Sequence, residues 1–290
     1  IDAEWKDLNY HSRPDLANAR KEYEAVEKIL SSAGAEVIKL PAGDGLTLDS
    51  IYTHDALIVT PRGLVKPRMG KPQRRRESEV NGAALAAMGF PIAGEITGDG
   101  KVEGGDLIWI DRYTLLAGIG YRTNLEGVRQ LGELAGEDVE ILWFDMPHYK
   151  GRSDVFHLMS TLSPLDHDLA VAYPPLMAAR QIEFLESRGI RLVEVPPEEF
   201  DTMGCNVLAL GPRHALMVDG NPETERRLKA ARSTPEAEVR SIPSTLIVPS
   251  LGVSSAPIML KNVLLLEPDG PITEMNSPLW ISTSTPRSAS

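Results

Sequence analysis

Hydrophobic and polar positions follow a pattern that recurs about every 50 residues along the chain. In each repeat, an apolar strand, a tight turn and a second apolar strand are followed by an amphipathic helix. The first strands begin near Ala56, Asp106, His157 and Asn206. A fixed period of this length is typical of units that stack or close into a ring, so we predict a ring of repeated units.

The helices are predicted from apolar positions at helical spacing, at 16–32, 77–88, 124–135, 176–187 and 222–231. The segment AEVIKL after the first helix reads as a strand, and short strands follow three of the others: VEILWF, IRLVEV and AEVRSI. The repeating unit is therefore strand–strand–helix–strand. Its hairpins imply antiparallel pairs, which disfavours a purely parallel sheet.

A polar group stands just before the first strand of each repeat. These groups are Asp55, then Glu103 with Asp106, then His157, then Cys205 with Asn206. A ring would bring the equivalent positions together at one mouth. Carboxylates that converge with a histidine are typical of a site for a cationic substrate.

Composition narrows the class of partner. The chain has 290 residues, a formal net charge of -11 and one cysteine. The acidic balance disfavours nucleic acid and anionic membranes and favours cations. One cysteine cannot form an internal disulfide, no apolar run approaches a membrane span, and the first residues are too polar for a signal peptide, so we expect a cytoplasmic protein. We predict a single domain over residues 1–275 and a disordered tail over 276–290.

Taken singly, each of these residues also has a plainer explanation. Glu103 and Asp106 flank two glycines and fit a simple turn, and His157 at the head of an apolar strand fits a satisfied core residue. Arg122 fits a solvated surface charge. The basic segment KPQRRRE fits either a loop that binds a carboxylate or a solvated surface.

Six motifs, taken in their order and spacing, resemble one known family. They are LDSIYTHD, RMGKPQRRRE, VEGGD, YRTN, FHLMS and MGCNVLAL. The set is similar to the amidinotransferase and dimethylarginine dimethylaminohydrolase family, which belongs with arginine deiminase to the pentein superfamily. The resemblance covers residues 49–231 and implies a five-fold pseudo-symmetric α/β propeller, in agreement with the repeat.

The resemblance also implies roles for the residues. His157 matches the general acid and base, Glu103 matches its partner carboxylate, and Arg74 and Arg122 match the arginines that hold the substrate's α-carboxylate. Asp49 and Asp55 match the acids that bind the guanidinium, and we count Asp106 with the substrate-binding residues. The division is chemically sound, because a guanidinium prefers carboxylate acceptors and a carboxylate prefers an arginine fork.

In the family mechanism, a cysteine thiolate attacks the guanidinium carbon and the histidine protonates the departing amine. Water then hydrolyses the amidino-thioether, or an acceptor amine takes the amidino group. The resemblance thus implies a hydrolase of C–N bonds in arginine metabolism, of dimethylargininase type, or an amidinotransferase. It implies an arginine-like substrate and no metal or organic cofactor, and it leaves a homodimer possible.

The chain departs from the family at the nucleophile, which relatives carry near the C-terminus. Its one cysteine, Cys205, lies in the fourth repeat and is interpreted as a small buried core residue. One repeat further on, Ser255 occupies the expected nucleophile position. Three explanations of the missing cysteine stay open. The chain is a divergent protein that only binds its ligand, a substitution has removed the nucleophile, or the reading frame has shifted after residue 231. No strand is evident before Asp15 to pair with the closing strand, so ring closure stays open.

Two further departures bear on the substrate. His54 stands where dimethylarginine hydrolases tend to have glutamate, which puts dimethylarginine in doubt. Met159 stands where arginine deiminases have aspartate, which weakens that assignment. Three hypotheses remain: a C–N hydrolase or amidinotransferase, a catalytically impaired binding protein, and a purely structural ring of the kind found in a translation factor.

Overall fold

Four units of the chain share one topology. The computed structural model describes residues 4–8, 10, 13–40, 42–152, 156–212, 214–231, 239–242 and 258–260. In each unit two strands form an antiparallel hairpin and the third lies parallel to the second. The hairpins confirm the predicted antiparallel pairs.

The strands and crossover helices follow in chain order. The first unit has β2 (Ile58–Thr60), β3 (Gly63–Lys66), α4 (Arg75–Ala87) and β4 (Ile92–Glu95). The second has β5 (Leu107–Trp109), β6 (Thr114–Ile119), α5 (Leu125–Ala135) and β7 (Glu140–Asp145). The third has β8 (Leu162–Asp166), β9 (Leu169–Ala172), α6 (Ala179–Ser187) and β10 (Arg191–Glu194). The fourth has β11 (Val207–Gly211), β12 (His214–Val218), α8 (Pro222–Ala231) and β13 (Val239–Ile242).

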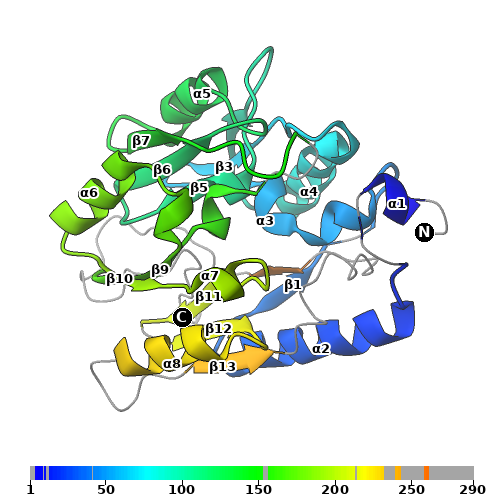
Figure 1. The fold of residues 1–290 in the computed structure, drawn as a ribbon. Helices are drawn as coiled ribbons and strands as arrows, with labels where there is room; N and C mark the ends of the chain where they lie inside the picture. The colour runs from blue at the N-terminus through cyan, green and yellow to red at the C-terminus, as the bar shows by residue number, and fades with distance from the viewer. Residues whose placement is uncertain are drawn as a thin grey trace, which may run out of the picture.

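A fifth, two-stranded sheet closes the ring. Strand β1 (Val37–Lys39) pairs antiparallel with β14 (Ile258–Leu260). The partner of the closing strand therefore lies after the long helix α2 (Leu16–Ser32), within the segment AEVIKL, and not before Asp15. With this seam the α/β fold is the predicted five-fold propeller, with helices outside the strands (Figure 1).

The helix predictions differ from the structure mainly at the starts. Helix α2 has the predicted bounds, because the Asp15 side chain caps it by accepting from Ala17 N and Asn18 N. Asn124 is the N-cap of α5 rather than its first residue. Residues 174–176 form a separate 3-10 helix before α6. Strand β4 was missed, because IAGE lacks a run of β-branched residues.

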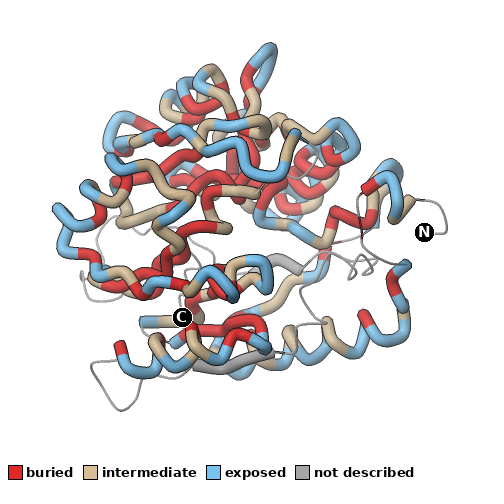
Figure 2. The backbone as a smooth tube through the Cα atoms, in the orientation of Figure 1, coloured by how far each residue is buried: buried red, intermediate tan, exposed pale blue. Residues whose placement is uncertain are grey.

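The core lies between neighbouring units, in the buried centre visible in Figure 2. One cluster joins the first and second units around Val65, Leu115 and Leu131. Another joins the third and fourth units and contains Cys205, which is 1% exposed. Since each unit buries its apolar face against the next, the ends of adjacent first strands are held close together.

Short helices stand at the heads of the units and carry the polar groups. The 3-10 helix η1 (Leu48–Ile51) and α3 (Thr53–Ala56) precede β2, η3 (Gly104–Asp106) precedes β5, and η4 (Leu158–Ser160) precedes β8. Helix η3 contacts both α3 and η4. The remaining short helices are α1 (Glu4–Asp7), η2 (Pro72–Arg74), η5 (Pro174–Leu176) and α7 (Pro197–Phe200). Among the described residues, no helix combines the length and apolar character needed to cross a membrane.

Candidate active site

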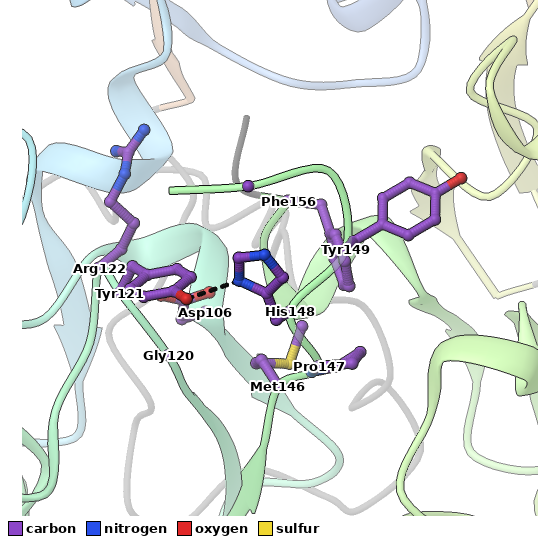
Figure 3. A pocket seen from close by; sticks show the side chains of 10 residues that line it. Asp106, Gly120, Tyr121, Arg122, Met146, Pro147, His148, Tyr149 and Phe156 are labelled. Carbon is purple, nitrogen blue, oxygen red and sulfur yellow. Dashed lines mark hydrogen bonds between the residues drawn. The ribbon is translucent and has the colours of Figure 1, made fainter. Parts of the chain in front are cut away.

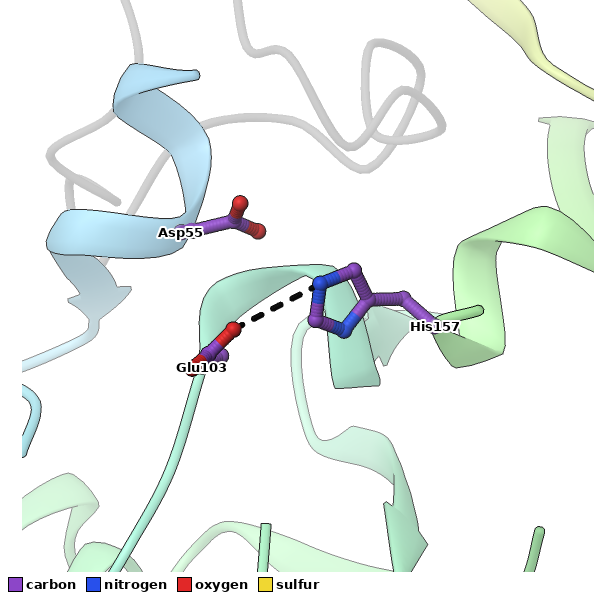
Figure 4. A group of neighbouring side chains, drawn as sticks. All are labelled: Asp55, Glu103 and His157. Carbon is purple, nitrogen blue, oxygen red and sulfur yellow. Dashed lines mark ion pairs between the residues drawn. The ribbon is translucent and has the colours of Figure 1, made fainter. Parts of the chain in front are cut away.

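Asp55, Glu103 and His157 meet where the first three units converge (Figure 4). Glu103 has no exposed surface, and its Oε2 lies 3.5 Å from His157 Nε2. The other ring nitrogen, Nδ1, lies 3.0 Å from Asp106 Oδ1. The repeat thus brings together the polar groups that precede the first three hairpins, as the sequence pattern predicted.

The two glycines of VEGGD are required by close packing. A Cβ on Gly104 would lie 2.0 Å from the His54 carbonyl oxygen, and a Cβ on Gly105 would lie 2.8 Å from His157 Cγ. The Gly105 N–H also donates to Asp55 Oδ1 at 2.8 Å. The glycines therefore let η3 pass between α3 and the imidazole, which makes the segment more than a simple turn.

Asp106 fixes the orientation of His157. Its Oδ1 lies against Nδ1 and also accepts from Leu158 N at 3.2 Å, while its Oδ2 accepts from Thr123 Oγ1 at 2.7 Å. Thr123 in turn accepts from the Glu103 N–H. A carboxylate at Nδ1 leaves Nε2 as the nitrogen that faces Glu103 and the centre of the site.

His157 carries a proton at neutral pH. Burial lowers the pKa of His157, but the charges of Asp106, Asp55 and Glu103 and the Asp106 hydrogen bond raise it by more, to about 9. By contrast, burial lowers the pKa of His54. Neutral His54 Nε2–H can then donate to the Gly104 carbonyl, 3.1 Å away. The two adjacent histidines are thus held in different charge states.

Asp55 belongs to a buried network with Arg74. Arg74 Nη1 donates to Asp55 Oδ2 at 2.5 Å, and Arg74 Nε and Nη2 donate to both oxygens of Glu77 at 2.9 and 2.7 Å. Burial tends to raise the pKa of the Asp55 carboxyl, but Arg74 and His157 lower it well below its usual range. Arg74 is 3% exposed, so its guanidinium is a fixed internal cation.

Two more ion pairs complete the centre. Lys71 Nζ lies 2.5 Å from Asp49 Oδ2, and Arg122 Nη1 donates to Glu103 Oε2 at 2.7 Å. The backbone N–H of Lys71 donates to Glu103 Oε1 at 2.9 Å. Asp49, Arg74 and Arg122 therefore all surround the triad. Their predicted contacts with substrate stay predictions.

The charges of this cluster do not cancel. The described site contains two more carboxylates than fixed cations, since Lys71, Arg74 and Arg122 face Asp49, Asp55, Glu77, Glu103 and Asp106. A protonated His157 offsets one of the two. Counted by formal charge with every carboxylate ionised, the centre therefore keeps one negative charge, which suits a monocation such as a guanidinium. Burial raises the pKa of the Glu77 carboxyl and so opposes its ionisation.

A cavity of about 210 Å³ adjoins the cluster (Figure 3). Arg122 and Asp106 line it on the side of the triad. Tyr121, His148 and Phe156 supply rings, and the Tyr121 hydroxyl lies 2.6 Å from His148 Nδ1. The site therefore extends beyond the triad into a ring-lined space.

The structure describes one of the two candidate nucleophiles, Cys205. Cys205 is a buried core residue, as predicted, and burial raises the pKa of its thiol. A protonated thiol of this kind is inert. Ser255 lies outside the described residues, as do residues 276–290. Met159, the second departure from the family pattern, packs against the core cluster shared by the second and third units.

The triad also has the spacing of a metal site, because one ligand atom each of Asp55, Glu103 and His157 fall within 4.8 Å of one another. Asp55 and Glu103 already accept from arginines, and His157 favours a proton, so the environment suits an organic cation better. Asp166, His167 and Asp168 form a second such group, of which His167 is exposed. The expected absence of a metal stays a prediction.

Sequence reasoning missed several supporting residues. Lys71 and Glu77 lie in the RMGKPQRRRE motif, and Thr123 lies in YRTN. The motifs therefore contained these residues but did not indicate which groups they contact. Glu77 was weighed as part of a loop or surface and is instead buried against Arg74. Tyr121 lies in YRTN and Phe156 in FHLMS, but neither was assigned a role, and His148 lies in an irregular segment outside all the motifs.

Comparisons with known proteins agree with this arrangement. Residues 49–186 match the family model described as arginine deiminase. The chain is 26% identical over 224 residues to the uncharacterized protein YkgA of Bacillus subtilis, covering 77% of this chain and 73% of that protein. It is 28% identical over 214 residues to an N(G),N(G)-dimethylarginine dimethylaminohydrolase of Streptomyces coelicolor. That match covers 74% of this chain and 76% of that protein.

A solved structure extends the likeness to the fold. Dimethylarginine dimethylaminohydrolase from Pseudomonas aeruginosa, in complex with citrulline, superposes with a TM-score of 0.69 at 20% identity. The match covers 89% of this chain and 95% of that one. It confirms the propeller fold, and together with the family model and the sequence relatives it confirms the resemblance read from the motifs.

Proposed function

We propose that this chain is a member of the amidinotransferase and dimethylarginine dimethylaminohydrolase family of the pentein superfamily, and that it binds the guanidino group of an arginine-like small molecule and cleaves one of its C–N bonds. Hydrolysis would give a ureido compound and an amine or ammonia. Transfer would instead pass the amidino group to an acceptor amine.

The single uncompensated negative charge at the buried centre is the observation that carries this proposal. Asp55 and Glu103 face His157 Nε2 and are almost wholly shielded from water. Carboxylates in such a place attract a cation strongly, because little solvent screens them. A guanidinium fits the planar, paired acceptors better than a compact ammonium does.

His157 supplies the proton for bond cleavage. With a pKa of about 9, it enters the reaction protonated at neutral pH. Nε2 then donates to the departing amine as the nucleophile bonds to the guanidinium carbon. The neutral imidazole that results takes a proton from water, and the hydroxide equivalent breaks the covalent intermediate. Glu103 and Asp106 hold the ring for both steps.

The nucleophile decides between catalysis and binding alone. Cys205 is buried in the core between the third and fourth units and carries a proton, so it cannot begin the reaction. Ser255 is our candidate at the nucleophile position. Because His157 enters the reaction protonated, the hydroxyl proton of Ser255 would pass to a carboxylate of the centre as the oxygen bonds to the guanidinium carbon. The specific observation that favours a binding-only alternative is the same burial of the chain's one cysteine.

A panel of guanidines tests the proposal. We expect L-arginine, its N-methylated forms or ω-guanidino acids to yield a ureido product by mass spectrometry, or to yield an amidino-transfer product when an acceptor amine is present. His157→Ala should slow turnover by roughly 10²- to 10⁴-fold, the usual contribution of a general acid–base group. Cys205→Ala is the matched control and should turn over at the wild-type rate.

Calorimetry with the same panel separates the outcomes. Heat of binding with no product would select the binding-only alternative. Neither heat nor product from any guanidine would overturn the proposed function.

A further inference from the structure

A groove lies between β7 of the second unit and α6 of the third, at the periphery of the ring (Figure 1). It encloses about 510 Å³, and its apolar lining includes Ile141, Trp143 and Phe184. Trp143 is 39% exposed, which is unusual for so large an apolar side chain. We call this surface the β7–α6 groove. An exposed apolar groove that is rimmed by polar residues is typical of a contact surface.

The edge of the sheet beside the groove is covered by Arg180. Strand β7 is the edge strand of its sheet, because it pairs only with β6. Arg180 Nη2 donates to the Trp143 carbonyl at 2.8 Å, and its Cζ lies 5.5 Å from the ring centres of Trp143 and Phe144. A fixed guanidinium on this edge disfavours the addition of a strand from another chain. A partner must therefore use the side chains of the groove.

Trp143 and Arg180 are the residue types that contribute most to protein–protein contacts. Tryptophan and arginine are enriched among the residues whose loss weakens an interface most strongly. In this groove the two side chains already contact each other, so a partner that covers them would restrict little additional side-chain motion. The groove therefore contains preformed anchors for another protein.

Glu183 lines the same groove, three residues after Arg180 on α6, but does not pair with it. Residues at this spacing share one face of a helix. On α4 the same arrangement, Arg76 followed by Glu79, forms an ion pair at 3.3 Å. On α6 the arginine contacts the Trp143 carbonyl instead, and the Glu183 carboxylate has no ion pair or hydrogen bond within the described part of the chain. One acid on this face is thus available to a partner.

The order of the two charges fits a second copy of this chain. When two α6 helices pack antiparallel about a two-fold axis, Arg180 of each copy faces Glu183 of the other. A purely acidic or purely basic partner would meet a like charge at one of the two positions. A second copy supplies both charges in the required order, and its own apolar groove covers Trp143 and Phe184.

We propose that the β7–α6 groove is a homodimer interface, in which Arg180 of each copy contacts Glu183 of the other across a two-fold axis. The formal net charge of -11 makes two copies repel each other, so a local match of charge is needed to offset that repulsion. The inference is independent of the proposed function, because the groove shares no residue with the polar centre.

Charge reversals in two separate variants test this contact by sedimentation velocity. The wild-type chain should sediment as a dimer at micromolar concentration. Arg180→Glu and Glu183→Arg each bring like charges together twice in a symmetric dimer, so each should weaken dimerisation at least about 100-fold. Arg76→Glu, in the exposed Arg–Glu pair of α4, is the matched control and should still dimerise like the wild type.

An equal mixture of the two reversal variants gives the sharpest measurement. One variant then presents acids at both positions and the other presents arginines, so both contacts of a mixed pair are complementary. The mixture should form a dimer although neither variant does so alone. A monomeric wild-type chain, reversal variants that dimerise as strongly as the wild type, or a mixture that stays monomeric would each overturn the proposal.

Discussion

The polar centre has two halves that use the same residue types differently. In the first half, built by η1, α3, η2 and α4, the carboxylates of Asp49, Asp55 and Glu77 contact the permanent cations Lys71 and Arg74. In the second half, built by η3 and the start of η4, Glu103 and Asp106 face an imidazole. We call these the paired half and the titrating half.

The difference shows that the partner of a buried carboxylate decides what the carboxylate does. In the paired half, ion pairs with Lys71 and Arg74 hold the carboxylates in place. In the titrating half burial lowers the pKa of His157, but the same kind of acid raises it by more, to about 9. Asp55 joins the halves, because one of its oxygens contacts Arg74 and the other accepts from Gly105 N. The first half should therefore govern stability and the second half chemistry.

The largest expected effect is on turnover, from Asp106→Asn in the titrating half. The amide removes the charge at Nδ1, and its NH₂ group can donate there and so favour the wrong tautomer. Turnover should fall on the order of 10⁴-fold, as expected when a carboxylate that orients a catalytic histidine is lost. The pKa of His157, followed by NMR, should fall by roughly 1–3 units. An unchanged imidazole pKa would show that Asp106 does not act through His157.

Arg74→Met in the paired half should show its effect in stability. The change leaves Asp55 and Glu77 buried without their cation, at a cost of about 3–5 kcal/mol in the free energy of unfolding. Arg129→Met is the control. Arg129 pairs with Glu126 and Glu133 on the exposed face of α5, so its loss should change the free energy of unfolding far less. Urea denaturation measures both, and equal losses would contradict a stabilising role for the buried ion pairs of the paired half.

The smallest expected effect concerns pH. The folded pKa of His157, about 9, lies above its ordinary value of 6.5. Its protonation therefore stabilises the fold fully below about pH 6.5, and this contribution is lost as the pH rises through 9. Glu103→Gln removes one of the charges that raise this pKa, so the upper limit should move down by roughly one unit. Thermal unfolding between pH 6 and 10 measures the shift, and an upper limit that does not move would contradict it.

The repeating features of the fold could be predicted from the sequence, and the contacts that do not repeat could not. The four hairpins and their helices follow from periodic apolar positions, and the period placed the polar groups at the heads of the first three hairpins at one centre. It failed for the fourth, because Cys205 lies in the core between the third and fourth units. The ion pairs could not be predicted. Arg74 contacts Glu77, which lies one helical turn away, and no pattern in the sequence indicates which buried partner lies within reach of a charged side chain.

The seam of the ring showed the same limit. Strand β1 was predicted as a strand but was not recognised as the partner of the closing strand, because a three-residue strand carries too little pattern to indicate its neighbour. Cys205 was interpreted correctly from its type and its surroundings in MGCNVLAL. The cavity beside Arg122 depends on loop geometry that no pattern in the sequence encodes.

The β1 and β14 seam also has a consequence for how the chain folds. Val37 and Leu260 pair across about 220 positions of sequence, and closing so long a loop costs roughly 2–3 kcal/mol more than closing a short hairpin. Within each unit, by contrast, hairpin and helix contacts are local and form early. The four units should therefore assemble in sequence before the ring closes. The seam joins only three residue pairs, against six between β6 and β7, so it is also where the closed ring should first come apart.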